Sequence, residues 1–174
     1  MSAPVDDGLL ALARRRPELA WLLVADMGLS AGLVSLGLSA LGGFAACHLC
    51  ILQRAALLAV APAAIVAAVR FRRPGGGAAA GLTLALAAAG LWVAVVQSVI
   101  ERRAGLACDA GAIPQALETA ALGLGALSPF LFGVEASCGA ARVAVAGVSL
   151  ANLGALAFAA MIGAGLWAIR RAQA

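Results

Sequence analysis

The segment CHLCILQR, residues 47–54, places two thiols, an imidazole and a guanidinium between two long apolar runs. Cys47 and Cys50 form a CxxC motif, and cysteines at this spacing on one helical turn lie about 5 Å apart, within reach of a disulfide. A disulfide between Cys47 and Cys50 would close a very small ring, so it would add little loop-closure stabilisation. The N-terminus of a helix, in contrast, favours the thiolate form of a cysteine. The motif therefore predicts redox chemistry. The alternative is a metal site in which His48 joins the two sulfur ligands.

Arg54 follows Cys50 by one helical turn, so both side chains are expected on the same face of a helix. A charged side chain within a membrane span is costly, and it is by default a functional hypothesis. A dithiol in a membrane must pass two electrons to an acceptor, and a quinone is a lipid-soluble two-electron acceptor. A guanidinium could stabilise the oxyanion that develops on the quinol, as in an oxyanion hole, and it keeps its charge in low dielectric. Alternatively, Arg54 only extends to the lipid headgroups.

The composition indicates that these residues belong to a membrane protein. The chain has 174 residues, of which 64% are hydrophobic and 11% are charged, and its mean hydropathy is +1.03. A bilayer core about 30 Å thick takes about 20 helical residues, and four apolar runs are long enough: 21–46, 50–69, 78–100 and 143–169. Because backbone groups in lipid must be satisfied internally, we predict an all-α, four-helix transmembrane bundle, as a single domain over residues 1–174. The first run is too long for a signal peptide, so it is expected to be retained.

The arginines predict the orientation of this bundle. The net charge is +4, but the basic residues lie at the ends of apolar runs, which is typical of topology signals and not of nucleic-acid binding. Eight of them fall on one side of a four-span arrangement: Arg14, Arg15, Arg16, Arg70, Arg72, Arg73, Arg170 and Arg171. The positive-inside rule then predicts that both termini of this multi-pass protein lie in the cytoplasm. We expect the membrane to be a bacterial inner membrane. The turn around Cys47 and the long loop 101–142 would face the periplasm.

The long loop is expected to carry a short helix. Apolar residues recur at positions 113, 117, 120, 121, 124 and 127, a spacing of three and four that gives one apolar stripe. Such a helix could lie flat in the membrane interface, and the following SPFLFG supplies two aromatic rings. The alternative is a packed loop helix without membrane contact.

All four cysteines are predicted on the periplasmic side. In an oxidising compartment they are expected to form disulfides, and four cysteines allow three pairings. Because Cys47 and Cys50 are close enough to pair, Cys108 and Cys138 are left as the second pair, within the long loop.

At these residues the chain resembles the DsbB family, disulfide bond formation protein B, whose members are inner-membrane quinone reductases that reoxidise the periplasmic oxidase DsbA. The resemblance rests on CHLCILQR, on the four spans, and on the cysteines in LACDA and EASCGA of the long loop. GVSLANLGALAF also resembles the family's fourth helix. The resemblance covers about residues 17–171.

The resemblance implies a quinone-dependent protein-disulfide oxidoreductase that supports protein folding in the periplasm. A reduced DsbA-like, thioredoxin-fold oxidase would attack the Cys108–Cys138 disulfide and be held at Cys108. Cys138 would then exchange with Cys47, which leaves Cys50 as a thiolate beside the quinone. Arg54 stands where the family's quinone-binding arginine is found. Ubiquinone is expected in preference to menaquinone.

The chain also departs from the family pattern. His48 lies inside the CxxC dipeptide, where apolar residues are more usual, and a cation there would favour a thiolate. Gln53 stands where some members carry an acid, and we assign it no role. Asp26, in the first span, is expected to be structural.

Two other classes of function compete with this one. A membrane thiol oxidoreductase similar to vitamin K epoxide reductase would also pair a membrane CxxC with loop cysteines. In those proteins the CxxC falls late in the bundle, whereas here it opens the second span. A non-enzymatic membrane scaffold with two structural disulfides would have no need of Arg54.

Overall fold

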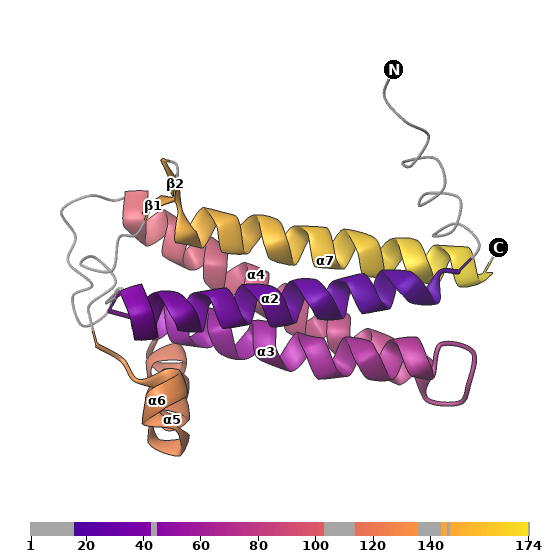
Figure 1. Ribbon diagram of the computed structural model, residues 1–174, viewed down its shortest axis with the longest axis horizontal. Coiled ribbons are helices and arrows are strands. Elements are labelled where there is room, and N and C mark those ends of the chain that lie inside the picture. Colours follow the sequence, from indigo (N-terminus) through magenta and orange to yellow (C-terminus); the bar gives the residue numbers. More distant parts are fainter. Residues whose placement is uncertain (1–15, 43–44, 103–113, 136–143, 146, 174) are drawn as a thin grey trace.

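Four long helices form the protein. The computed structural model describes residues 16–42, 45–102, 114–135, 144–145 and 147–173. The long helices lie side by side along one axis (Figure 1), and they are α2 (Glu18–Gly42), α3 (His48–Val69), α4 (Gly76–Arg102) and α7 (Leu150–Gln173). Each is long and apolar enough to cross a membrane. The predicted all-α, four-span fold is therefore confirmed.

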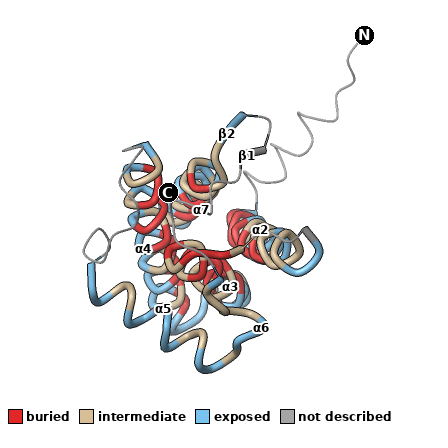
Figure 2. The backbone as a smooth tube through the Cα atoms, turned by 90° about the vertical axis from the view of Figure 1, so that its left-hand side faces the viewer, coloured by how far each residue is buried: buried red, intermediate tan, exposed pale blue. Residues whose placement is uncertain are grey.

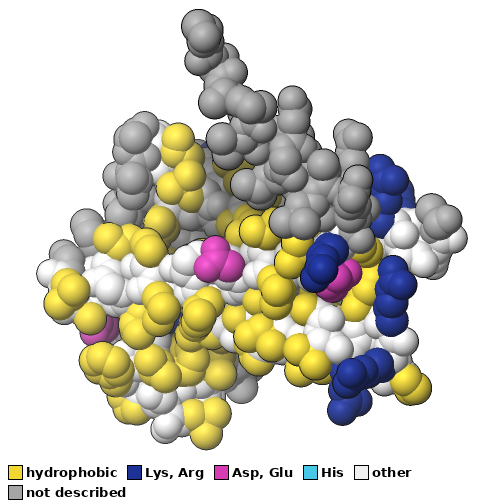
Figure 3. Space-filling view, turned by 45° about the vertical axis from the view of Figure 1, so that its right-hand side comes forward, with side chains coloured by type: hydrophobic (Ala, Val, Ile, Leu, Met, Phe, Trp, Pro, Cys, Tyr) yellow, Lys and Arg dark blue, Asp and Glu magenta, His cyan; other side chains and the backbone are white. Residues whose placement is uncertain are grey.

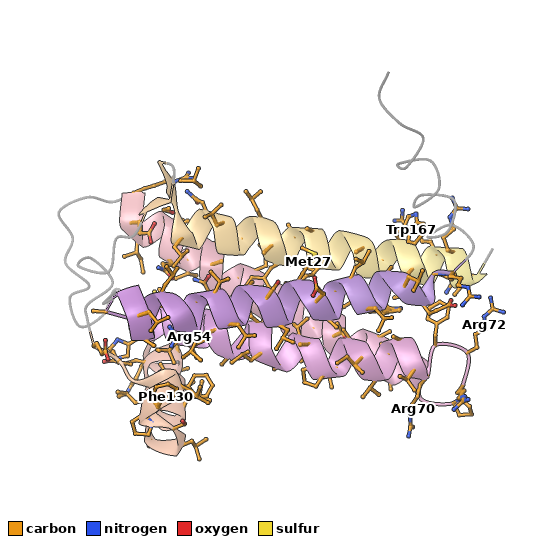
Figure 4. All side chains as sticks on the ribbon, viewed as in Figure 1. Met27, Arg54, Arg70, Arg72, Phe130 and Trp167 are labelled. Carbon is orange, nitrogen blue, oxygen red and sulfur yellow. The ribbon has the colours of Figure 1, made fainter. Side chains whose placement is uncertain are left out.

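The two ends of the bundle differ in chemistry. The start of α2, the turn between α3 and α4 and the end of α7 lie together at one end, where Figure 4 labels Arg70, Arg72 and Trp167. Figure 3 shows arginine side chains gathered at this end, while hydrophobic side chains cover the helices. Arg54 and Phe130 lie at the opposite end (Figure 4). We call the first the arginine end and the second the cysteine end, because Cys47 precedes α3 there.

The helix boundaries differ from the predicted ones where local backbone chemistry decides them. The last long helix starts at Leu150 and not at residue 143, because β1 (Ala144–Val145) and β2 (Val148–Ser149) form a short antiparallel hairpin first. Gly147 takes a positive φ of 80° in its turn, a conformation that glycine adopts at little cost. The Ser149 hydroxyl then accepts from the Asn152 N–H and caps the helix. Hydropathy alone cannot reveal this, since hairpin and helix are equally apolar.

The core depends on small residues at the helix contacts. Figure 2 shows buried residues on the sides of the long helices that face one another. The central cluster joins all four long helices, with Val24, Leu57, Ala87 and Phe158 among its members. Because lipid is as apolar as the core, close packing of this kind holds membrane helices together.

Gly90 is one position where close packing requires glycine. A Cβ built on Gly90 would overlap the ring of Phe158 from α7, whereas a Cβ on Gly81 of the same helix meets nothing within 4 Å. Gly90→Ala is therefore expected to lower stability in detergent by about 1–3 kcal/mol through overpacking. Gly81→Ala should leave the melting temperature unchanged or raise it slightly. Equal melting temperatures for the two variants would contradict this packing.

The short helices lie across the bundle at the cysteine end. α5 (Gln115–Leu127) and α6 (Pro129–Phe132) run transverse to the long helices (Figure 1). Ala121 is buried and Leu117 packs against the cluster around Cys47, while Leu127 and Phe130 are 82% and 75% exposed. The predicted loop helix is thus confirmed. Its transverse direction and exposed apolar side chains suit a position in the membrane interface.

Candidate active site

The two motif cysteines lie at the first turn of α3. Cys47 is the N-cap residue with an extended backbone, and its Sγ accepts from the Cys50 N–H at 3.4 Å. The two Sγ atoms lie 2.9 Å apart, so the pair needs little movement to form or open a disulfide. Cys47 is fully buried among Leu49 and Val93, whereas Cys50 is partly exposed. The cysteine pair is therefore positioned by a helix start, as the spacing predicted.

Cys50 opens onto a cavity between the long helices. The cavity has a volume of about 200 Å³, and side chains of α2, α3, α4 and α7 line it. Cys50, Arg54 and Gln97 contribute polar atoms at the cysteine end, and Leu57, Leu153 and Ala157 contribute apolar surface. A cavity of about 150 Å³ is known to bind benzene in another protein, so this one has room for a single six-membered ring.

Arg54 is buried and bonded within the protein. Its side chain is 3% exposed, so the guanidinium does not reach out to the headgroups. Its Nε donates to Ser35 Oγ at 3.2 Å, and Nη2 donates to the Ser35 carbonyl at 3.0 Å and to Ser39 Oγ at 2.6 Å. Nη1 donates to the Leu131 carbonyl of α6 at 2.8 Å.

These bonds make Arg54 a clamp between three elements. It fastens α3 to α2 and to the transverse helix pair, immediately beside the cavity. Among the described residues, the bonds use four of the five N–H groups of the guanidinium. The second Nη1 proton makes no hydrogen bond to a described residue, and Arg54 lines the cavity.

Gln97 bonds to Cys50 and is itself bonded to two further polar residues, and the sequence did not reveal the role of these three. Gln97 Nε2 donates to Cys50 Sγ at 3.4 Å and to Glu101 Oε1 at 3.1 Å. Gln53 Nε2 donates to Gln97 Oε1 at 2.6 Å. A signal was present, since Gln97 is the strongly polar residue within the span 78–100 and Gln53 lies between the cysteines and Arg54.

The remaining predicted residues are placed as follows. Cys108 and Cys138 lie outside the described residues, so their pairing stays a prediction. His48 is the first residue of α3 and is partly exposed. Asp26 lies on the exposed side of α2, within the span.

Comparison with known proteins identifies the family. Searches of curated proteins and of solved structures gave no significant match. The family model described as "Disulfide bond formation protein DsbB" matches residues 16–168, which include all four long helices up to the last turns of α7. A CxxC at the start of a membrane helix, with four candidate spans around it, agrees with that match. The chain therefore belongs to the DsbB family of disulfide bond formation proteins.

Proposed function

We propose that the protein oxidises a periplasmic DsbA-like dithiol protein and passes the electrons to a membrane quinone. The observation that carries the proposal is that Cys50 and Arg54 line the same cavity at the cysteine end of the bundle. Oxidation of two thiols to a disulfide releases two electrons and two protons, which is what reduction of a quinone to a quinol takes up. The cysteine pair is thus the electron donor of a balanced reaction, and a quinone bound in the cavity would be its acceptor.

The size and lining of the cavity support a quinone head group as its occupant. One six-membered ring fits a volume of about 200 Å³. Leu57, Leu153 and Ala157 supply apolar walls, and the free Nη1 proton of Arg54 offers a donor for a quinone oxygen. A quinone bound there would accept the electrons that leave Cys50.

The distribution of charge supports the orientation of the relay. The arginine end carries Arg70, Arg72, Arg170 and Arg171, so the positive-inside rule assigns it to the cytoplasm. The cysteine end then faces the periplasm, where a thioredoxin-fold partner can reach it. The relay itself follows the family: the partner attacks the Cys108–Cys138 pair, and electrons continue to Cys47 and Cys50.

The direct test is turnover with a defined donor and acceptor. Full-length protein in detergent would be mixed with a reduced DsbA-like oxidase and ubiquinone, and the quinone absorbance would be followed. The proposal expects quinone loss that depends on both components, with one quinone reduced for each partner oxidised. A protein that binds the partner but leaves the quinone unreduced would overturn the proposal and favour a scaffold.

Arg54 offers a test of the cavity itself. Arg54→Lys keeps the charge but cannot reach Ser35, Ser39 and Leu131 together, because an ammonium lacks the planar fork. We expect the KM for ubiquinone to rise about tenfold or more, as the loss of one charge-assisted bond would produce. Arg70→Lys, an exposed arginine at the opposite end, is the matched control and should change nothing. An unchanged KM in Arg54→Lys would refute a cavity-bound quinone at this arginine.

A further inference from the structure

Gln97 is the link between Cys50 and a carboxylate at the cysteine end. Its side chain is 2% exposed, and its amide makes three bonds to side chains of α3 and α4. Nε2 serves both Cys50 Sγ and Glu101 Oε1, while Oε1 receives Gln53 Nε2. These partners define the orientation of the buried amide. The orientation decides whether the NH₂ group, a donor, or the oxygen, an acceptor, faces Cys50 Sγ.

Glu101 determines which end of the amide faces the sulfur. An ionised carboxylate is only an acceptor, so it must be met by the NH₂ group of Gln97. The same NH₂ group then points its second proton at Cys50 Sγ. If the amide were reversed, its oxygen would face both the carboxylate and the sulfur, and a thiolate there would be repelled.

Gln53 holds the amide from the other side. It is 8% exposed and donates its own NH₂ group to Gln97 Oε1 at 2.6 Å. Its Oε1 lies against Gly154 of α7, so close that a Cβ on Gly154 would come within 2.5 Å of it. The orientation of Gln97 is thus determined by an acceptor on its nitrogen side and a donor on its oxygen side.

We propose that Gln97 is a further catalytic residue, which donates a hydrogen bond to the Cys50 thiolate, and that Glu101 and Gln53 are positioning residues for its amide. The inference deepens the proposed function, because it concerns the sulfur from which electrons leave. A donor fixed on Cys50 Sγ stabilises the thiolate over the thiol. The chain thereby keeps Cys50 ready to give up its electrons after Cys47 has been engaged by an incoming sulfur.

The thiolate fraction of Cys50 can be measured without a quinone or a partner. In full-length protein with Cys47, Cys108 and Cys138 replaced by Ser, iodoacetamide can alkylate Cys50 alone. The ratio of the alkylation rate at acidic pH to that at alkaline pH reports ionisation, since altered access changes both rates alike. Gln97→Met keeps the length of the side chain and removes the donor, and it should lower this ratio about tenfold. An unchanged ratio would overturn the proposal.

Glu101→Gln separates positioning from simple charge. Removing a negative charge near Cys50 would by itself raise the thiolate fraction. Glutamine can donate as well as accept, so it no longer selects the NH₂ end of Gln97, and this loss of orientation should lower the thiolate fraction. We expect a fall of about threefold, because Gln53 still holds the amide in part. A rise in the ratio would contradict the role given to Glu101.

Ser98→Ala is the matched control. Ser98 is buried on the same turn of α4 but donates to the Ala94 carbonyl of its own helix, so its removal should leave the ratio unchanged. Quinone turnover of the unmodified protein is measured separately. If the unmodified protein reduces no quinone, the proposed function fails. The effect of Gln97→Met on the alkylation ratio is measured without quinone, so the role given to Gln97 stands or falls separately.

Discussion

Cys50→Ser is expected to lower quinone reduction by at least about a thousandfold, because an alcohol cannot replace the thiolate from which the electrons leave. The sulfur is partly exposed and lines the cavity with Arg54, while its neighbour Cys47 is fully buried behind it. The measurement is the rate of ubiquinone bleaching with a reduced DsbA-like donor. The effect should lie in kcat, since most of the cavity lining is unchanged.

A control for this variant is available on the helix next to it. Ser30→Ala removes an exposed hydroxyl of α2 that bonds to the Met27 carbonyl, and it should retain full activity and the same melting temperature. If Cys50→Ser kept a substantial rate, electrons would be leaving from another sulfur, and the cavity beside Cys50 would not be the site of quinone reduction.

Cys138→Ala is expected to stop turnover and to accumulate a mixed disulfide between Cys108 and the partner. The alanine cannot displace the partner from Cys108, and thiol–disulfide exchange needs a second thiolate to resolve such a complex. Because Cys108 is left as a thiol in this variant, the partner carries only its attacking cysteine, activated as a mixed disulfide with thionitrobenzoate, which the Cys108 thiolate displaces. The measurement is a non-reducing gel of full-length protein incubated with this activated partner. The complex should disappear on addition of a reductant.

Cys108→Ala gives the matched control for the trapping experiment. It removes the sulfur that bonds to the partner and leaves Cys138, so no partner complex should form although turnover is also lost. A complex trapped equally through either cysteine would contradict the assignment of Cys108 as the point of attack. A complex formed instead with Cys47 would remove the loop pair from the relay.

The four spans could be predicted because length and hydropathy determine them. Their ends could not, because single residues decide them. Cys47 caps α3, so this helix begins at His48 and not at residue 50. Ser149 and the turn at Gly147 place a hairpin where the apolar pattern predicts a helix. α2 ends at Gly42, although the apolar run continues to residue 46.

The site was predictable where its residues are close in sequence. Cys47, Cys50 and Arg54 share one helix, so their spacing already predicted one face. Gln97 reaches Cys50 from α4, and Ser39 reaches Arg54 from α2. Such contacts depend on how the helices pack, and hydropathy does not specify that rotation. Arg54 shows the difference most clearly, since the sequence predicted a quinone ligand and the structure adds a clamp to α6.

The central claim is that the cysteines feed electrons directly to a quinone, and the stoichiometry of a single turnover tests it. Full-length protein would be fully reduced, freed of reductant, and mixed anaerobically with excess ubiquinone. Four cysteines forming two disulfides release four electrons, so two quinones should be reduced per protein, and one in a variant that lacks Cys108 and Cys138. Quinone that stays oxidised while all four thiols remain reduced would contradict the claim.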